Sequence, residues 1–172
     1  MRPTFILKNL PRREALGVLA RRYPDFELSA QECFLALLGV AGAVMDDMEA
    51  QLARRGTSQG RFRVLLHLER APGRVLAAGR LAEALGVTPA TVTGLLDGLE
   101  RDGQVRRERS VADRRGIRAR LTPRGSRLLA ELMPARFRRT SAIMAELSEP
   151  DRRTLVRLLD AVSAGLAQAA PV

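Results

Sequence analysis

The sequence feature that most constrains the fold is a short amphipathic helix followed directly by an arginine-rich hairpin, between residues 88 and 125. Thr88 can cap this helix, because a threonine oxygen accepts a hydrogen bond from an amide of the first turn. Four apolar residues then recur at helical spacing and commit one face to a core. They are Val92, Leu95, Leu96 and Leu99. The opposite face is small and polar, and is open to a partner. Its residues are Ala90, Thr91, Thr93, Gly94, Asp97 and Arg101.

The hairpin is strongly basic. Eight arginines lie within residues 106–124, against only two acids, Glu108 and Asp113. Two short alternating runs, 105–109 and 117–121, flank a turn-like segment and predict two strands. The whole chain of 172 residues carries a formal net charge of +10. Because this charge is concentrated beside a helix with a small polar face, it favours nucleic acid as the partner.

Upstream of this region the pattern is helical. A short helix is predicted over 11–23 and stops before Pro24. A longer helix is predicted from Ser29, which forms a capping box with Glu32, to Gly56. The N-terminal part of the chain is therefore expected to hold one short and one long helix.

The middle of the chain predicts a helix-turn-helix. Thr57 is expected to cap a helix that runs to about Arg70. A short strand is predicted within 71–77. Residues 79–85 then form the first helix of the helix-turn-helix, and the second begins after Thr88.

The C-terminal part predicts two more helices. Thr122 caps the first, and Pro123 occupies its first position, where a missing N–H costs nothing. This helix is expected to run to about Leu147 and to bend at Pro134, which removes one backbone hydrogen bond. Ser148 caps the last helix.

The long helix and the last two helices carry more apolar surface than a small domain can cover. Two stripes show it: Leu37, Ala41, Val44, Met48 and Leu52, and then Leu155, Leu159, Val162 and Leu166. A second copy of the chain is the simplest partner that could bury these apolar stripes, so a homodimer is expected.

The helix and hairpin resemble the recognition helix and wing of the multiple antibiotic resistance regulator (MarR) family of winged helix-turn-helix repressors. The matching residues are Ala90, Thr91, Leu96, Asp97, Leu99, Glu100, Gly103, Asp113, Arg115, Leu121, Thr122 and Gly125. The resemblance extends more weakly from about residue 29 to the end. It departs from the family at Gly94, Gly98 and Gln104, where larger polar, basic or apolar residues are usual.

The resemblance implies a mainly α fold with a small β wing, in which a winged helix-turn-helix is joined to a helical dimerisation domain. Residues 1–28 would be an N-terminal extension with a short helix, and 29–56 a dimerisation helix. Residues 57–121 would be the DNA-binding domain, and 122–172 the C-terminal dimerisation helices. The expected partner is double-stranded DNA with a pseudo-palindromic site, bound by a homodimer with its recognition helices about one turn apart.

Recognition helices enter the major groove by their N-terminal residues, so one set of side chains should lie nearest the base edges. It comprises Thr88, Ala90, Thr91, Thr93 and Gly94. Arg101 is expected to bind DNA as well. The other hairpin arginines are expected to neutralise phosphates, although strand alternation turns some of them away: Arg106, Arg107, Arg109, Arg114, Arg118 and Arg120. The resemblance gives Arg115 a minor-groove role and Asp113 the role of orienting it. Gly94 and Gly98 either allow a close approach of DNA or are merely tolerated.

The resemblance also implies release of DNA by a small aromatic or phenolic acid. His67 is the candidate effector ligand, with Arg63 one helical turn earlier. The competing hypothesis is peroxide sensing by Cys33, whose segment QECFLAL resembles that of the hydroperoxide sensors in the same family. The chain has one tyrosine, Tyr23, outside that segment, so a buried and inert Cys33 is favoured.

No paired carboxylates, nucleophile-base arrangement or phosphate loop is visible, so the chain is not expected to be an enzyme. The single cysteine leaves no intrachain disulfide and no multi-cysteine metal site, and no cofactor is expected.

We find no apolar run long enough to cross a bilayer, which predicts a cytoplasmic protein without a membrane partner. Two alternatives remain: a nonspecific architectural DNA-binding protein, and an unrecognised enzyme with a winged-helix accessory.

Overall fold

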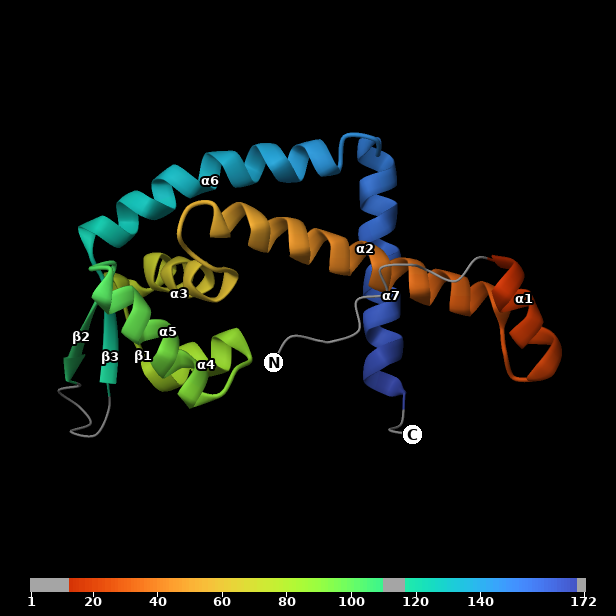
Figure 1. Cartoon of the computed structure of the whole chain (residues 1–172), viewed down its shortest axis with the longest axis horizontal. Coiled ribbons are helices and arrows are strands. Elements are labelled where there is room, and N and C mark those ends of the chain that lie inside the picture. Colours follow the sequence, from red (N-terminus) through yellow and green to blue (C-terminus); the bar gives the residue numbers. More distant parts are fainter. Residues whose placement is uncertain (1–12, 110–116, 170–172) are drawn as a thin grey trace.

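The computed structural model describes residues 13–109 and 117–169, and places a compact lobe at one end of two long helical arms (Figure 1). The lobe contains three helices and a small sheet. These are α3 (Gln59–Arg70), α4 (Ala78–Leu85), α5 (Pro89–Arg101), β1 (Val75–Ala77), β2 (Val105–Arg109) and β3 (Ile117–Leu121). Both strand pairs are antiparallel and the order is β1-β3-β2, so the predicted strands and the short strand within 71–77 are confirmed.

A single apolar cluster holds the lobe together. The predicted inner face of α4, Leu81, Ala82 and Leu85, is buried. On α5, three of the four predicted core residues are buried, and Leu95 packs against the same cluster at its edge. The α3 residues Phe62, Val64, Leu65 and Leu68 lie beneath both helices, each at most 1% exposed. The packing therefore fixes which face of α5 is presented to solvent.

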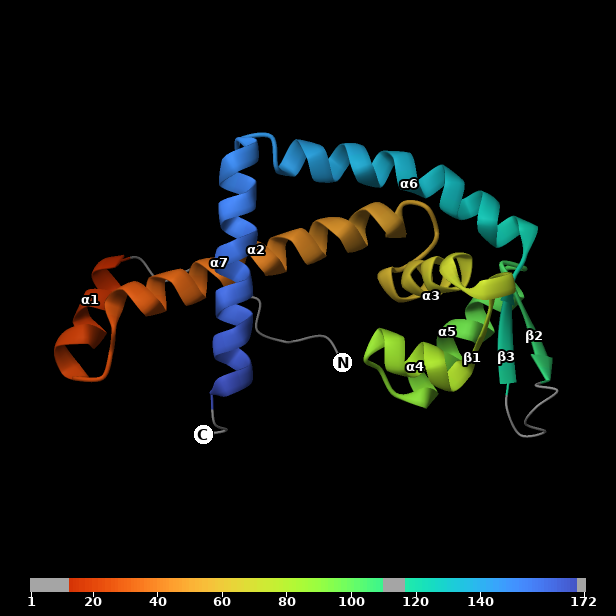
Figure 2. The same cartoon turned by 180° about the vertical axis from the view of Figure 1, so that it is seen from behind.

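The arms leave the lobe together. Seen from the lobe, α2 (Leu28–Ala53) extends outward and ends at α1 (Arg13–Arg22) (Figures 1 and 2). Helix α6 (Pro123–Ile143), which contains Pro134, extends outward from the lobe on the same side. Helix α7 (Glu149–Gln168) then turns across the arms. Every described residue of α7 is exposed in this single chain.

Three of the predicted helix caps are confirmed and two are wrong. Thr88, Thr122 and Ser148 cap α5, α6 and α7 by accepting backbone N–H bonds. Ser29 does not cap α2: the helix begins at Leu28 after the extended Glu27, and the Ser29 hydroxyl donates to the Glu27 carboxylate at 3.2 Å. The predicted capping box, which requires Ser29 at the N-cap, is therefore wrong for this helix.

The cap of α3 lies one residue later than predicted. Gly56, with φ of 69°, ends α2 in the left-handed conformation, and the Thr57 amide donates back to the Leu52 carbonyl at 3.1 Å. Thr57 is therefore part of the C-terminal motif of α2 and is buried. Ser58 is the next extended residue, and its hydroxyl accepts from the Arg61 amide at 3.3 Å.

Two further differences concern helix length and hydropathy. Helix α6 ends at Ile143 and not near Leu147, because hydrogen bonds between residues three apart replace the helical i to i+4 bonds there.

Helix α2 is long and apolar enough to cross a membrane by length and composition, with an 18-residue window of mean hydropathy 1.6. The expectation that no stretch reaches this length was wrong, since it considered only runs uninterrupted by charge.

Candidate nucleic-acid interface

The outer face of α5 presents the predicted base-reading residues to solvent. All five of them, and Arg101 at the other end of the helix, are exposed. The Thr88 hydroxyl accepts from the Thr91 amide at 3.2 Å and lies 2.9 Å from the Thr91 hydroxyl. The Thr93 hydroxyl donates to the Pro89 carbonyl at 3.0 Å. These bonds fix the rotamers of the three threonines and leave acceptor capacity on the solvent side.

The exposed arginines of the wing strands differ in whether they are paired within the protein. Arg106 and Arg109 of β2 are exposed, and among the described residues they form no ion pair. Arg120 of β3 instead binds Glu108 through two bonds of 2.7 and 3.2 Å, which hold the pKa of that carboxyl below its usual value. Arg106 and Arg109 are thus the wing cations best placed for phosphates. The predicted Asp113, Arg114 and Arg115 lie outside the described residues.

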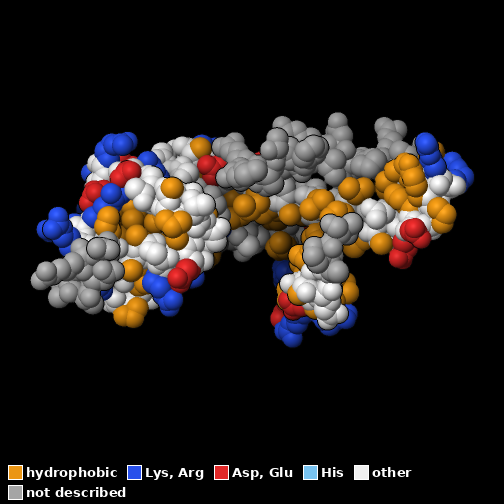
Figure 3. Space-filling model, turned by 90° about the horizontal axis from the view of Figure 1, so that it is seen from below, with side chains coloured by type: hydrophobic (Ala, Val, Ile, Leu, Met, Phe, Trp, Pro, Cys, Tyr) orange, Lys and Arg blue, Asp and Glu red, His pale blue; other side chains and the backbone are white. Residues whose placement is uncertain are grey.

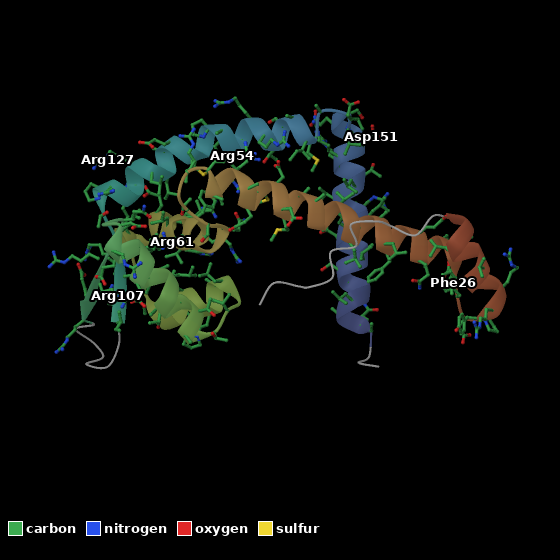
Figure 4. All side chains as sticks on the ribbon, viewed as in Figure 1. Phe26, Arg54, Arg61, Arg107, Arg127 and Asp151 are labelled. Carbon is green, nitrogen blue, oxygen red and sulfur yellow. The ribbon has the colours of Figure 1, made fainter. Side chains whose placement is uncertain are left out.

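Arg107 occupies a different environment from the one predicted for a phosphate contact. Its side chain is 22% exposed and points at α5, as Figure 4 shows. Its guanidinium donates to the Thr93 carbonyl at 3.0 Å and to the Asp97 carboxylate at 2.5 Å. Its backbone amide donates to Glu100 at 2.9 Å. Sequence analysis did not predict these contacts. The signal for them was that Asp97 and Glu100 lie one turn apart on the helix, where one cation can reach both.

The two glycines of α5 have different surroundings. Gly98 is buried, and a Cβ there would collide with the guanidinium of Arg61, which pairs with Asp102 at 2.8 Å. The Arg61 side chain would therefore have to shift to admit a Cβ at residue 98. Gly94 is exposed, and a Cβ built on it would meet no described atom within 4 Å outside the backbone of its own helix. Nothing inside the described part of the chain requires a glycine at 94.

The two predicted effector residues lie apart from the pocket that α2 and α6 form. Arg63 is exposed, and His67 is half-buried beside a shallow depression lined by α4 and β1. A pocket of about 300 Å³ lies between α2 and α6, and Phe62 of α3 also lines it. Sequence analysis did not find this pocket, because it depends on how two helices far apart in the chain are placed.

Arginines dominate the charge of this pocket. Arg139 of α6 binds Asp47 of α2 through two bonds of 2.8 and 3.0 Å, and this pairing lowers the pKa of Asp47. Arg136 stacks over the Phe62 ring, with its guanidinium carbon 4.8 Å from the centroid. Arg54 and Arg55 also line the pocket, and Figure 4 marks Arg54 at the end of α2. The pocket is suited to an aromatic anion.

Cys33 is exposed in this chain, so the expectation of a buried thiol was wrong. The reason is its position in the first part of α2, which extends away from the core of the lobe (Figure 1). Its neighbour Phe34 is 55% exposed.

The fold and the exposed face of α5 define a winged helix-turn-helix protein. The MarR family model matches residues 55–116. The chain is 36% identical to the HTH-type transcriptional repressor YetL of Bacillus subtilis over 153 residues, 89% of this chain and 92% of YetL. It is 26% identical to the transcriptional repressor MprA of Escherichia coli, over 86% and 84% of the two chains. The chain therefore belongs to the MarR family, whose members are transcription regulators and not enzymes.

Solved structures agree with this assignment. A MarR family transcriptional regulator from Streptomyces coelicolor, in complex with DNA, superposes with a TM-score of 0.74. The two chains are 26% identical, over 81% of this chain and 89% of the other. The predicted fold class, a mainly α winged helix-turn-helix with a small β wing, is confirmed.

Proposed function

We propose that the chain is a cytoplasmic, homodimeric repressor that binds a pseudo-palindromic DNA site and is released by a small aromatic or phenolic acid. The observation that carries this proposal is the face of α5: it is exposed, small and polar, and it is held on a buried core next to the basic wing. The DNA complex of the relative from Streptomyces coelicolor supports the choice of partner.

The proposed contacts divide between base edges and backbone. Threonine hydroxyls and the methyl groups of alanine and threonine would read base edges in the major groove, and arginines would bind phosphates. The base-reading set is Thr88, Ala90, Thr91, Thr93 and Gly94; the phosphate-binding set is Arg101, Arg106, Arg109 and Arg114. From the family resemblance, Arg115 would enter the minor groove with Asp113 orienting it.

The dimer is proposed from apolar side chains that the chain leaves uncovered. On α7 these are Leu155, Val156, Leu158, Leu159, Val162 and Leu166, between 38% and 78% exposed. On α2, Phe34, Leu38, Val40 and Met45 are between 41% and 64% exposed, and Figure 3 shows apolar side chains along this arm. Surfaces of this kind mark an interface. We therefore assign 29–56 and 122–172 to dimerisation, 57–121 to DNA binding, and 1–28 to an N-terminal extension.

Footprinting on the DNA that flanks the gene of this protein tests the proposal. We expect protection of two related half-sites with centres about one helical turn, roughly 10 bp, apart. Competition with unrelated duplex should leave the protected site occupied. Equal affinity for all duplexes would contradict the proposal and favour a nonspecific architectural protein.

The pocket between α2 and α6 is the proposed effector site. A carboxylate could pair with Arg136, and an aromatic ring could pack beside Phe62. Salicylate and benzoate are suitable probes for release of a labelled duplex. We expect Arg136→Ala to raise the concentration needed for release by at least about 10-fold, since a charged hydrogen bond contributes about 1.5–3 kcal/mol. His67→Ala is the matched control. An effect of His67→Ala alone would restore the sequence-based assignment of His67 and Arg63.

The exposure of Cys33 keeps peroxide sensing as a second candidate. It would be favoured if stoichiometric peroxide released DNA from the native protein and not from Cys33→Ser. Release by the aromatic acids alone would reject it.

Gly94→Ala separates the stability of α5 from its fit to DNA. Alanine is a better helix former than glycine by about 1 kcal/mol, and the site has room for it, so the free protein should become more stable. If the helix backbone approaches DNA closely at Gly94, the same variant should bind its site more weakly. Thermal unfolding and anisotropy titration measure the two effects. Greater stability with unchanged affinity would show that Gly94 lies away from the DNA.

A further inference from the structure

We infer that Arg107 is a positioning residue that locks the recognition helix α5 to the wing, and that it is not a phosphate contact. This inference rests on the proposed DNA-binding function. The first observation is that Arg107 is engaged within the protein. It reaches Thr93, Asp97 and Glu100, which follow at i, i+4 and i+7 along one stripe of α5. One arginine of β2 therefore spans two turns of the helix.

Charge supports the same assignment. Arg107 lies between two carboxylates, with Asp97 at 2.5 Å from its guanidinium and Glu100 at 3.5 Å. A single cation beside two anions gives no net positive charge to attract a phosphate. The guanidinium is also the less exposed partner, at 22% against 51% for Asp97 and 42% for Glu100. Arg106 and Arg109, on the same strand, are exposed and are the contrasting phosphate candidates.

The geometry explains why such a lock is needed. Helix α5 joins β2 through a tight turn, in which Gly103 has φ of 67° and the Gln104 amide donates to the Leu99 carbonyl at 2.8 Å. A turn fixes the two elements at one point and leaves the angle between them to other contacts. Arg107 supplies a second polar attachment, because it binds Asp97 and Thr93, which lie ten and fourteen residues before it in the chain. It thereby sets where the wing lies when α5 is in the major groove.

The test compares salt dependence for variants of this site with that of a phosphate candidate. Affinities of native protein, Arg107→Ala and Arg109→Ala would be measured over a salt series on the footprinted duplex and on a random duplex. Loss of a phosphate contact lowers the slope of log affinity against log salt by about one on both duplexes, as expected for Arg109→Ala. For Arg107→Ala we expect at least a 10-fold loss on the specific duplex and an unchanged slope on the random one.

Two further variants separate position from charge. Arg107→Lys keeps the charge and loses the planar fork that reaches several acceptors, so it should fail to restore specific affinity. Asp97→Asn removes a negative charge near the DNA, so simple electrostatics predicts tighter binding. The lock predicts the reverse on the specific duplex, a loss of at least 5-fold. A slope reduced by one in Arg107→Ala, together with tighter specific binding by Asp97→Asn, would overturn the inference.

A readout without DNA distinguishes this inference from the proposed function. Hydrogen exchange of the α5 amides in the full-length protein should be at least 5-fold faster in Arg107→Ala than in Arg109→Ala, with far-UV circular dichroism confirming that both variants fold. Unchanged exchange would reject the lock even if the protein binds its site. A native protein that prefers no duplex would reject the proposed function, whatever the exchange rates.

Discussion

A Leu159→Arg variant is expected to be monomeric and to lose at least about 100-fold in affinity for a duplex with two half-sites, because linked half-sites gain two or more orders of magnitude from being bound together. Leu159 lies at the centre of the exposed apolar face of α7, with Leu155 one turn before it and Val162 one turn after. A charge buried in such an interface without a partner carries a large desolvation cost. Light scattering and anisotropy titration measure the two effects.

Ala164→Arg is the matched control for this experiment. It adds the same charge to the same helix, but Ala164 falls on the side away from the apolar stripe by helical spacing. The control should remain dimeric and bind as the native protein does. The buried apolar cluster that holds the lobe includes no residue of α7, so the monomeric variant should keep its helical circular dichroism signal. A dimeric Leu159→Arg with native affinity would show that α7 is not the interface.

Gly125→Ala is expected to lower the free energy of unfolding by about 1–3 kcal/mol, the usual cost of overpacking a tight site. Gly125 lies in the first turn of α6, where its amide donates to the Thr122 hydroxyl at 3.1 Å. A Cβ there would collide with the backbone carbonyl of Gln104 and would lie 2.7 Å from Leu121 Cδ1. The carbonyl also accepts from the Thr122 amide at 3.1 Å and so cannot move freely.

Chemical denaturation measures this effect, and Gly94→Ala is its internal control. Both variants make the same change within a helix, but only Gly125 faces a backbone group. The two should therefore move the unfolding midpoint in opposite directions. A Gly125→Ala protein as stable as the native one would show that α6 is not docked on the turn between α5 and β2.

Most of the helices and strands could be predicted from local patterns in the sequence. The caps at Thr88, Thr122 and Ser148 were predictable because each depends only on a hydroxyl and the next three residues. The cap of α3 was not, because Thr57 and Ser58 are both suitable by type. The choice between them depends on Gly56, which draws Thr57 into the end of α2.

Much of the site could not be predicted, because it depends on contacts between residues that are far apart in the sequence. An arginine in an alternating basic run looks the same whether it faces solvent or a carboxylate on another element, so Arg107 was grouped with phosphate contacts. The space beside Gly98 likewise depends on Arg61, which is remote in the sequence and pairs with Asp102. The pocket of Arg136 and Arg139 requires the relative placement of α2 and α6, which periodicity alone does not contain.

The central claim is that two copies of the chain bind one specific duplex. Native mass spectrometry of the protein with a duplex of about 30 bp, cut from the footprint, measures the stoichiometry directly, and competition with unrelated duplex measures specificity. We predict two chains on each duplex, retained against about a 1,000-fold excess of competitor, the lower end of the range for specific DNA-binding proteins. One chain for each duplex, or equal displacement by an unrelated sequence, would contradict the account.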